Sequence, residues 1–158
     1  ATLCTRNPQC LICPFKGSCL ALRAGLQREI PLPKKKLQRK KQDRTFLLIW
    51  FDDRCLLHKR TEKGVWKGLF SLPQIEGILT EEETQKAVQA MGFIVKNIRR
   101  LDVFSHDFTH YRLMLHPIAI SVEPKNDLNR QDRWASLSEL PDIGLPAPIR
   151  DLLERFFT

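Results

Sequence analysis

Residues 45–60 read TFLLIWFDDRCLLHKR, and the core of the fold is organised around this stretch. Two short apolar runs flank Asp52 and Asp53, a pair of residue types that favours a turn over a continued strand. The pattern therefore predicts a strand, a tight turn and a second strand. Cys55 lies in the second apolar run and is expected to be a core residue.

The segments that follow alternate between helical and strand-like patterns. Residues 64–73, GVWKGLFSLP, are punctuated by glycine and proline. Thr80 and the three glutamates after it predict a helix start, and Gly92 predicts its end. Two strand-like stretches, 93–104 and 108–122, precede a helix over 148–157 with Pro148 in its first turn. This order predicts a mixed α+β domain without internal repeats.

Four cysteines lie near the start of the chain in the string CTRNPQCLICPFKGSC, residues 4–19. Thiols spaced this closely, without a secretory signal, indicate a metal or cluster site formed by Cys4, Cys10, Cys13 and Cys19. A single CxxC flanked by two five-residue gaps differs from the paired short spacings of zinc ribbons. The spacing favours an iron–sulfur cluster, with zinc as the alternative.

Length and hydropathy point to one domain with a small appendage. The chain has 158 residues, and no apolar run approaches the roughly 20 residues needed to span a bilayer. No signal peptide is apparent, so we expect a cytoplasmic monomer without membrane association. Because the first cysteine follows Ala1 by only three residues, we also expect the chain to be a fragment of a longer polypeptide.

Basic residues dominate the charge, which is +8 in total. Residues 34–41, KKKLQRKK, could be a solvated linker, a phosphate-contacting segment or both. We expect a cysteine loop over 1–22, a basic linker over 23–44 and a globular domain over 45–158. The expected DNA-contacting residues are basic side chains in the first two segments: Arg6, Lys16, Arg23, Lys34, Lys35 and Lys36.

Four motifs occur in a fixed order: the cysteine loop, the basic linker, GVWKGLFSLPQ and FSHDFTHYRL. Together they resemble the C-terminal half of the adenine DNA glycosylase MutY family, over essentially the whole chain. The resemblance implies a 4Fe–4S cluster at the end of a helix-hairpin-helix domain. It also implies a Nudix-like, MutT-like mixed-sheet domain that recognises 8-oxoguanine opposite adenine in double-stranded DNA. The first cysteine gap has five residues, whereas the family usually has six.

The resemblance places this chain in DNA base-excision repair. The full-length enzyme would hydrolyse the N-glycosidic bond of the mispaired adenine, using a Glu and an Asp upstream of this chain. We therefore expect this fragment alone to be inactive. A metal-stabilised nucleic-acid-binding module without lesion specificity is the alternative.

An active Nudix hydrolase is a weaker alternative, because the metal-binding carboxylates are missing. Its signature is GX5EX7REUXEEXGU. With the closing glycine aligned on Gly92, Gln85 and Lys86 occupy the RE positions, and Gln89 and Ala90 occupy the EE positions. Divalent cations in such sites need several carboxylate oxygens. The sequence thus predicts a Nudix-like fold without hydrolase chemistry.

The segment 104–111, FSHDFTHY, is the expected lesion-recognition site by the same resemblance. Phe108 would lie beside the stacked base, and Thr109, which replaces a common serine, would offer its hydroxyl to the altered guanine edge. His110 would support the loop or contact phosphate. Alternatively, these residues are core positions of a strand pair. Trp66 is expected to fill the core rather than stack on a base.

Overall fold

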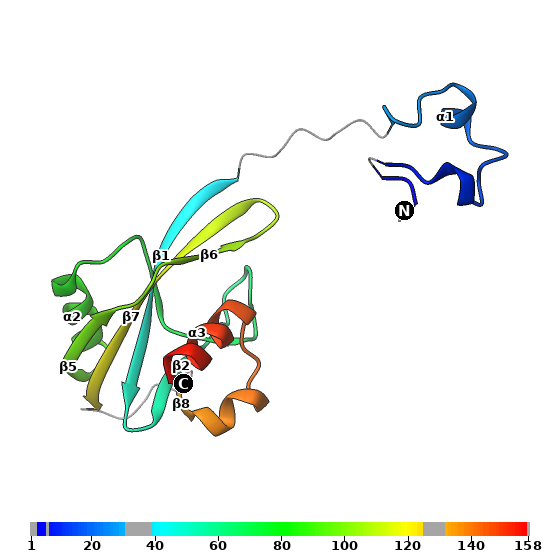
Figure 1. Ribbon diagram of the computed structural model, residues 1–158. Helices are drawn as coiled ribbons and strands as arrows, with labels where there is room; N and C mark the ends of the chain where they lie inside the picture. The colour runs from blue at the N-terminus through cyan, green and yellow to red at the C-terminus, as the bar shows by residue number, and fades with distance from the viewer. Residues whose placement is uncertain (1–2, 6, 31–38, 125–131, 158) are drawn as a thin grey trace. The chain divides into compact units, whose positions relative to one another are not determined.

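The computed structural model describes residues 3–5, 7–30, 39–124 and 132–157. The chain divides into two compact units, residues 1–38 and residues 39–158, and each is described separately (Figure 1). Among the described residues, no helix has both the length and the apolar character required to cross a bilayer.

The first unit is a cysteine-containing loop with two short helical segments. A 3-10 turn, η1, spans Cys10–Ile12, and helix α1 spans Leu20–Arg23. The helix ends before Gly25, which has a φ of 70°. The Gly25 N–H donates to the Leu22 carbonyl and the Leu26 N–H to the Ala21 carbonyl, which is the Schellman arrangement that ends helices.

The second unit is a mixed sheet with two helices. Its main path has the order β3-β2-β1-β7-β5, with β4 paired to β1, β6 to β7 and β8 to β2. The elements are β1 (Lys40–Phe51), β2 (Arg54–Lys59), β3 (Phe70–Ser71), β4 (Gln74–Glu76), α2 (Glu81–Ala90), β5 (Phe93–Arg100), β6 (Phe104–Asp107), β7 (Tyr111–Pro124), β8 (Asp132–Ser136), the 3-10 helix η2 (Leu137–Asp142) and α3 (Ala147–Phe157).

The centre of the sheet is the parallel pair β1 and β7, in register from Lys40 opposite Tyr111 to Trp50 opposite Ser121. Strand β1 therefore begins at Lys40, five residues before the predicted start of the globular domain. Residues 40–44 are strand rather than linker, because β7 provides them with backbone hydrogen-bonding partners that local composition does not reveal.

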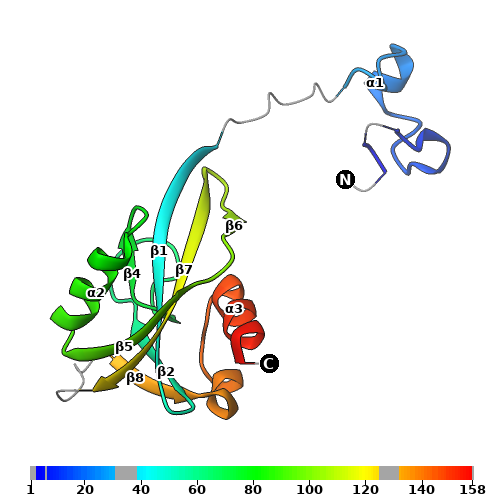
Figure 2. The same ribbon diagram turned by 60° about the vertical axis from the view of Figure 1, so that its left-hand side comes forward.

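The two helices cover opposite faces of the sheet, as Figure 2 shows with α2 on one side and α3 on the other. Residues 45–49 are all buried, as expected for a strand covered on both faces. Phe46 and Leu48 belong to the core that includes α3, whereas Leu47 and Ile49 belong to the core that includes Val88 of α2.

Local signals in the sequence are confirmed at several boundaries. Asp52 has a φ of 53°, and Phe51 pairs with Arg54 across the predicted tight turn. Thr80 and Glu83 form a reciprocal capping box at the start of α2. Gly92 has a φ of 89° just after that helix. Cys55 is fully buried, and burial raises the pKa of its thiol to about 12.

Candidate functional site

The predicted recognition segment forms a hairpin between β6 and β7. The two strands pair from Phe104 opposite Leu115 to Asp107 opposite Arg112. The Phe108 N–H then donates to the Tyr111 carbonyl at 2.9 Å, so Thr109 and His110 form the tip. Both tip residues are exposed, whereas Phe108 and Tyr111 are half-buried. The hairpin therefore presents the two predicted polar residues to solvent.

Four rings support this tip and are called the aromatic cluster: Trp66, His106, Phe108 and Tyr111. Phe108 stacks on Tyr111 with ring centroids 4.7 Å apart. It also makes an edge contact with His106 at 4.8 Å and lies 5.4 Å from Trp66. Aromatic pairs of this geometry each contribute about 0.5–1.5 kcal/mol beyond the area that they bury. The cluster therefore fixes the position of Phe108.

Trp66 reaches the hairpin from the loop between β2 and β3. It is half-buried at the edge of the core, so the expectation that it fills the core is correct only in part. Its φ of 65° is uncommon for a bulky residue and costs on the order of 1–3 kcal/mol. Sequence periodicity carries no signal for such a backbone angle, which explains why the contact with Phe108 was not predicted.

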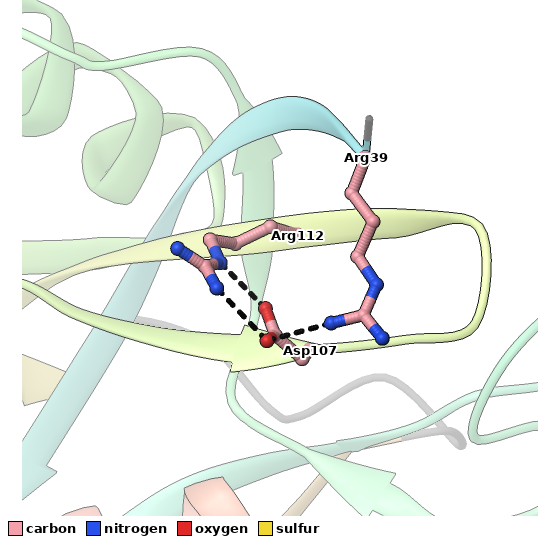
Figure 3. A network of polar contacts seen from close by, with 3 residues as sticks. All are labelled: Arg39, Asp107 and Arg112. Carbon is pink, nitrogen blue, oxygen red and sulfur yellow. Dashed lines mark hydrogen bonds and ion pairs between the residues drawn. The ribbon is translucent and has the colours of Figure 1, made fainter. Parts of the chain in front are cut away.

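A charged network lies next to the tip of the same hairpin, at the last strand pair before it (Figure 3). Arg112 donates to both carboxylate oxygens of Asp107, at 2.6 and 2.9 Å, and Arg39 donates to one of them at 2.7 Å. The hydrogen bonds from Arg112, its charge and the contact with Arg39 lower the pKa of Asp107. Two guanidinium groups share one carboxylate, so this end of the hairpin keeps an excess positive charge.

The four cysteines of the first unit line a single cavity of about 90 Å³. Apolar side chains, including Leu3 and Leu22, form much of its remaining wall, and Lys16 also borders it. Within the described residues, no three or more Cys, His, Asp or Glu side chains are arranged to hold a single metal ion. Four thiolates are a donor set that suits an iron–sulfur cluster and also a tetrahedral zinc ion.

The other predicted DNA contacts are only partly described. Lys16 is exposed. Arg23 donates from Nη2 to the Gly17 carbonyl at 2.9 Å, so this side chain also supports the loop. The remaining candidates lie outside the described residues: Arg6, Lys34, Lys35 and Lys36.

A sequence profile of the NUDIX domain family matches residues 44–155. The chain belongs to the NUDIX domain family. Solved NUDIX domains share its fold. The MutT NUDIX hydrolase from Burkholderia pseudomallei aligns with a TM-score of 0.59 at 19% identity, over 73% of this chain and 98% of that chain. The C-terminal domain of mouse MUTYH, solved in complex with human PCNA, aligns with a TM-score of 0.57 at 12% identity, over 73% of this chain and 86% of that chain. These structures confirm the predicted MutT-like mixed sheet.

Curated relatives extend the similarity beyond the NUDIX domain. The adenine DNA glycosylase of Buchnera aphidicola subsp. Schizaphis graminum is 32% identical over 99% of this chain and 46% of that protein. The adenine DNA glycosylase of Buchnera aphidicola subsp. Acyrthosiphon pisum is 28% identical over 99% of this chain and 45% of that protein. The chain thus spans about half the length of these relatives and matches them in the cysteine loop as well as in the NUDIX domain.

Helix α2 occupies the position of the NUDIX signature but has lost its acidic face. Gln85, Lys86, Gln89 and Ala90 are all exposed on this helix. Of the three glutamates in its first turn, Glu83 accepts the Thr80 N–H at 2.7 Å. This backbone hydrogen bond is the main cause of the lowered pKa of Glu83. The acidic residue at this helix start therefore caps the helix.

Proposed function

We propose that this chain is the C-terminal part of an adenine DNA glycosylase that acts in base-excision repair. Its NUDIX domain would recognise 8-oxoguanine opposite adenine in duplex DNA. The observation that carries the proposal is the β6–β7 hairpin, whose exposed tip is fixed by the aromatic cluster. The similarity to adenine DNA glycosylases over 99% of this chain supports the same assignment.

The chemistry of the tip suits an oxidised guanine. 8-Oxoguanine differs from guanine by a carbonyl at C8 and an N–H at N7, so its altered edge offers one acceptor and one donor. The Thr109 hydroxyl can donate and accept, and it lies at the exposed tip. Phe108 provides an aromatic face next to it, on which a base can stack. Thr109 would read the altered edge, and Phe108 would hold the base in position.

Sequence-independent affinity would come from basic side chains that contact phosphates. His110 at the tip and Arg112 in the strand pair next to it lie on the same hairpin as Thr109. Lys16, Arg6, Lys34, Lys35 and Lys36 would extend these contacts outside the NUDIX domain. Such contacts fix the register of the duplex but do not distinguish one base from another.

Cys4, Cys10, Cys13 and Cys19 would bind a 4Fe–4S cluster, which would act as a structural centre of the first unit. The support is that all four thiols line one cavity. Anaerobic purification with quantified iron, sulfide and zinc tests this assignment. Iron and sulfide with visible absorbance would support the cluster, whereas stoichiometric zinc without iron would replace it.

Hydrolysis of the glycosidic bond would depend on a Glu and an Asp outside this chain. The chain alone is therefore expected to bind a lesion duplex without releasing adenine. Release of adenine from an 8-oxoguanine mismatch by the purified chain would contradict the assignment of catalysis to residues outside this chain.

Binding to matched duplexes tests the function. Dissociation constants would be measured for adenine opposite 8-oxoguanine and opposite guanine, over a range of salt concentrations. A preference for the lesion that persists at high salt supports the proposal, because readout of a base edge depends weakly on counterion release. Equal binding to both duplexes, lost as salt increases, would instead identify a nucleic-acid-binding module without lesion specificity.

A further inference from the structure

A second cavity lies in the NUDIX domain, away from the residues assigned to lesion recognition. It has a volume of about 350 Å³. Its wall combines β1, the end of β2 and the loop that follows, β4, and the residue after α2. The lining residues that matter for its chemistry are Arg44, His58, Arg60, Glu62, Gln74 and Met91.

Arg60 gives this cavity an unsatisfied donor. Its Nε is buried and has no hydrogen-bond partner among the described residues. Its backbone is held on both sides, because its N–H donates to the Leu69 carbonyl at 3.0 Å and its carbonyl accepts from Gly68 at 2.7 Å. A buried guanidinium N–H without an acceptor is unfavourable, and the same side chain lines the cavity, so a rotation that brings its donors to an acceptor in the cavity would relieve this cost.

The charges around the cavity favour an anion. Arg44 and Arg60 are opposed by one carboxylate in the lining, that of Glu62. His58 is held by its Nδ1, which lies 2.7 Å from a carboxylate oxygen of Asp132. Guanidinium groups present paired N–H donors that match the oxygens of phosphate. The lining therefore offers donors and positive charge in excess of acceptors.

The same lining does not suit a divalent cation. Met91, the residue after α2, is part of the wall, and Glu62 supplies the one carboxylate in the lining. Mg²⁺ sites that bind phosphate use carboxylate oxygens together with the phosphate itself. We propose that this cavity binds a phosphoryl group directly through Arg60 and Arg44, without a divalent metal ion. This differs from metal-dependent NUDIX hydrolysis, and the phosphoryl group could come from the DNA backbone or from a free nucleotide.

Titration of the whole chain with inorganic pyrophosphate in EDTA, followed by calorimetry, tests the proposal. Saturable binding is expected, and Arg60→Gln and Arg44→Gln should each weaken it at least about tenfold, the effect of losing about 1.4 kcal/mol of binding free energy. Glu62→Gln should strengthen binding, because it removes the opposing charge. Lys63→Gln is the matched control, since Lys63 is exposed in the same loop and does not line the cavity.

The opposite signs expected for Arg60→Gln and Glu62→Gln separate a site effect from misfolding. A requirement for Mg²⁺, equal weakening by Arg60→Gln and Lys63→Gln, or no saturable binding would each overturn the proposal. Competition with undamaged duplex then identifies the source of the phosphate. Displacement of pyrophosphate by duplex, lost in Arg60→Gln, assigns the site to the DNA backbone. Simultaneous binding of both assigns it to a free phosphate compound.

Discussion

Phe108→Ala removes the ring that joins the hairpin tip to the aromatic cluster. In wild type, the Phe108 ring stacks on Tyr111 at 4.7 Å and makes an edge contact with His106 at 4.8 Å. The variant loses both contacts. Truncation of a fully buried phenylalanine costs about 3–5 kcal/mol, so for this half-buried ring we expect about 2 kcal/mol of unfolding free energy. Domains of this kind have about 5–15 kcal/mol, so the variant should remain folded.

The binding effect should have a part that is common to both duplexes and a part that is specific to the lesion. Stacking of one base on an aromatic side chain contributes about 1–3 kcal/mol, and because guanine and 8-oxoguanine both present an aromatic face, its loss weakens binding to both duplexes by up to roughly 5- to 150-fold in Kd. Fluorescence anisotropy with 8-oxoguanine and guanine duplexes measures the ratio of the two Kd values. The ratio should also fall in Phe108→Ala, by roughly 2- to 13-fold, because the tip that places Thr109 at the altered edge is no longer held and about 0.5–1.5 kcal/mol of hydrogen bonding is lost.

Phe157→Ala is a matched control on α3. Phe157 is also half-buried and makes an edge contact with Phe156 at 5.0 Å. It should lose a similar amount of stability and keep the wild-type ratio of Kd values. An unchanged ratio in Phe108→Ala, or an equal loss of ratio in both variants, would refute the reasoning.

Three further predictions concern the stability and reactivity of the domain. Thr80→Ala should lower the unfolding free energy by about 1 kcal/mol in urea titrations, because the Thr80 hydroxyl accepts the Glu83 N–H; equal stability of the two proteins would contradict this. Burial raises the pKa of the Cys55 thiol to about 12, so denaturant should expose one more thiol to Ellman's reagent at pH 8 in wild type than in Cys55→Ser; rapid reaction of Cys55 in the native protein would be inconsistent. Hydrogen bonds from the Ser136 N–H and from Arg133 lower the pKa of Glu139 from its ordinary value of 4.5 to about 2. The ionised carboxylate therefore contributes fully to the unfolding free energy above pH 4.5, and this contribution disappears as the pH falls towards 2. In acid denaturation, the difference in unfolding free energy between wild type and Glu139→Gln should shrink as the pH falls from 4.5 to 2. A constant difference would argue against this role of Glu139.

The parts of the fold that the sequence predicted are those with local causes. The capping box of Thr80 and Glu83 lies within four residues, and Gly92 ends the same helix through its own backbone conformation. The tight turn at Asp52 depends on the short segment between two apolar runs. These signals depend only on neighbouring residues, so the sequence alone predicts them.

The parts that the sequence missed depend on distant partners or on unusual backbone angles. Lys40 begins β1 because Tyr111, far along the chain, pairs with it. Trp66 reaches the hairpin because its φ is positive, and the residue pattern does not predict this backbone angle. For the candidate site, the resemblance located Phe108, Thr109 and the tip, but not the cluster that fixes them. The buried donor of Arg60 is likewise visible only once the surrounding loop is folded.

The central claim is that the hairpin tip reads the oxidised base, and a difference map of amide chemical shifts tests it most directly. Spectra of the chain would be recorded with two duplexes that differ only in guanine or 8-oxoguanine opposite adenine, so that general DNA contacts cancel. We expect the differences to concentrate at Phe108, Thr109 and His110, with a smaller effect at Trp66. Identical spectra with the two duplexes, or differences centred away from the hairpin, would contradict the claim.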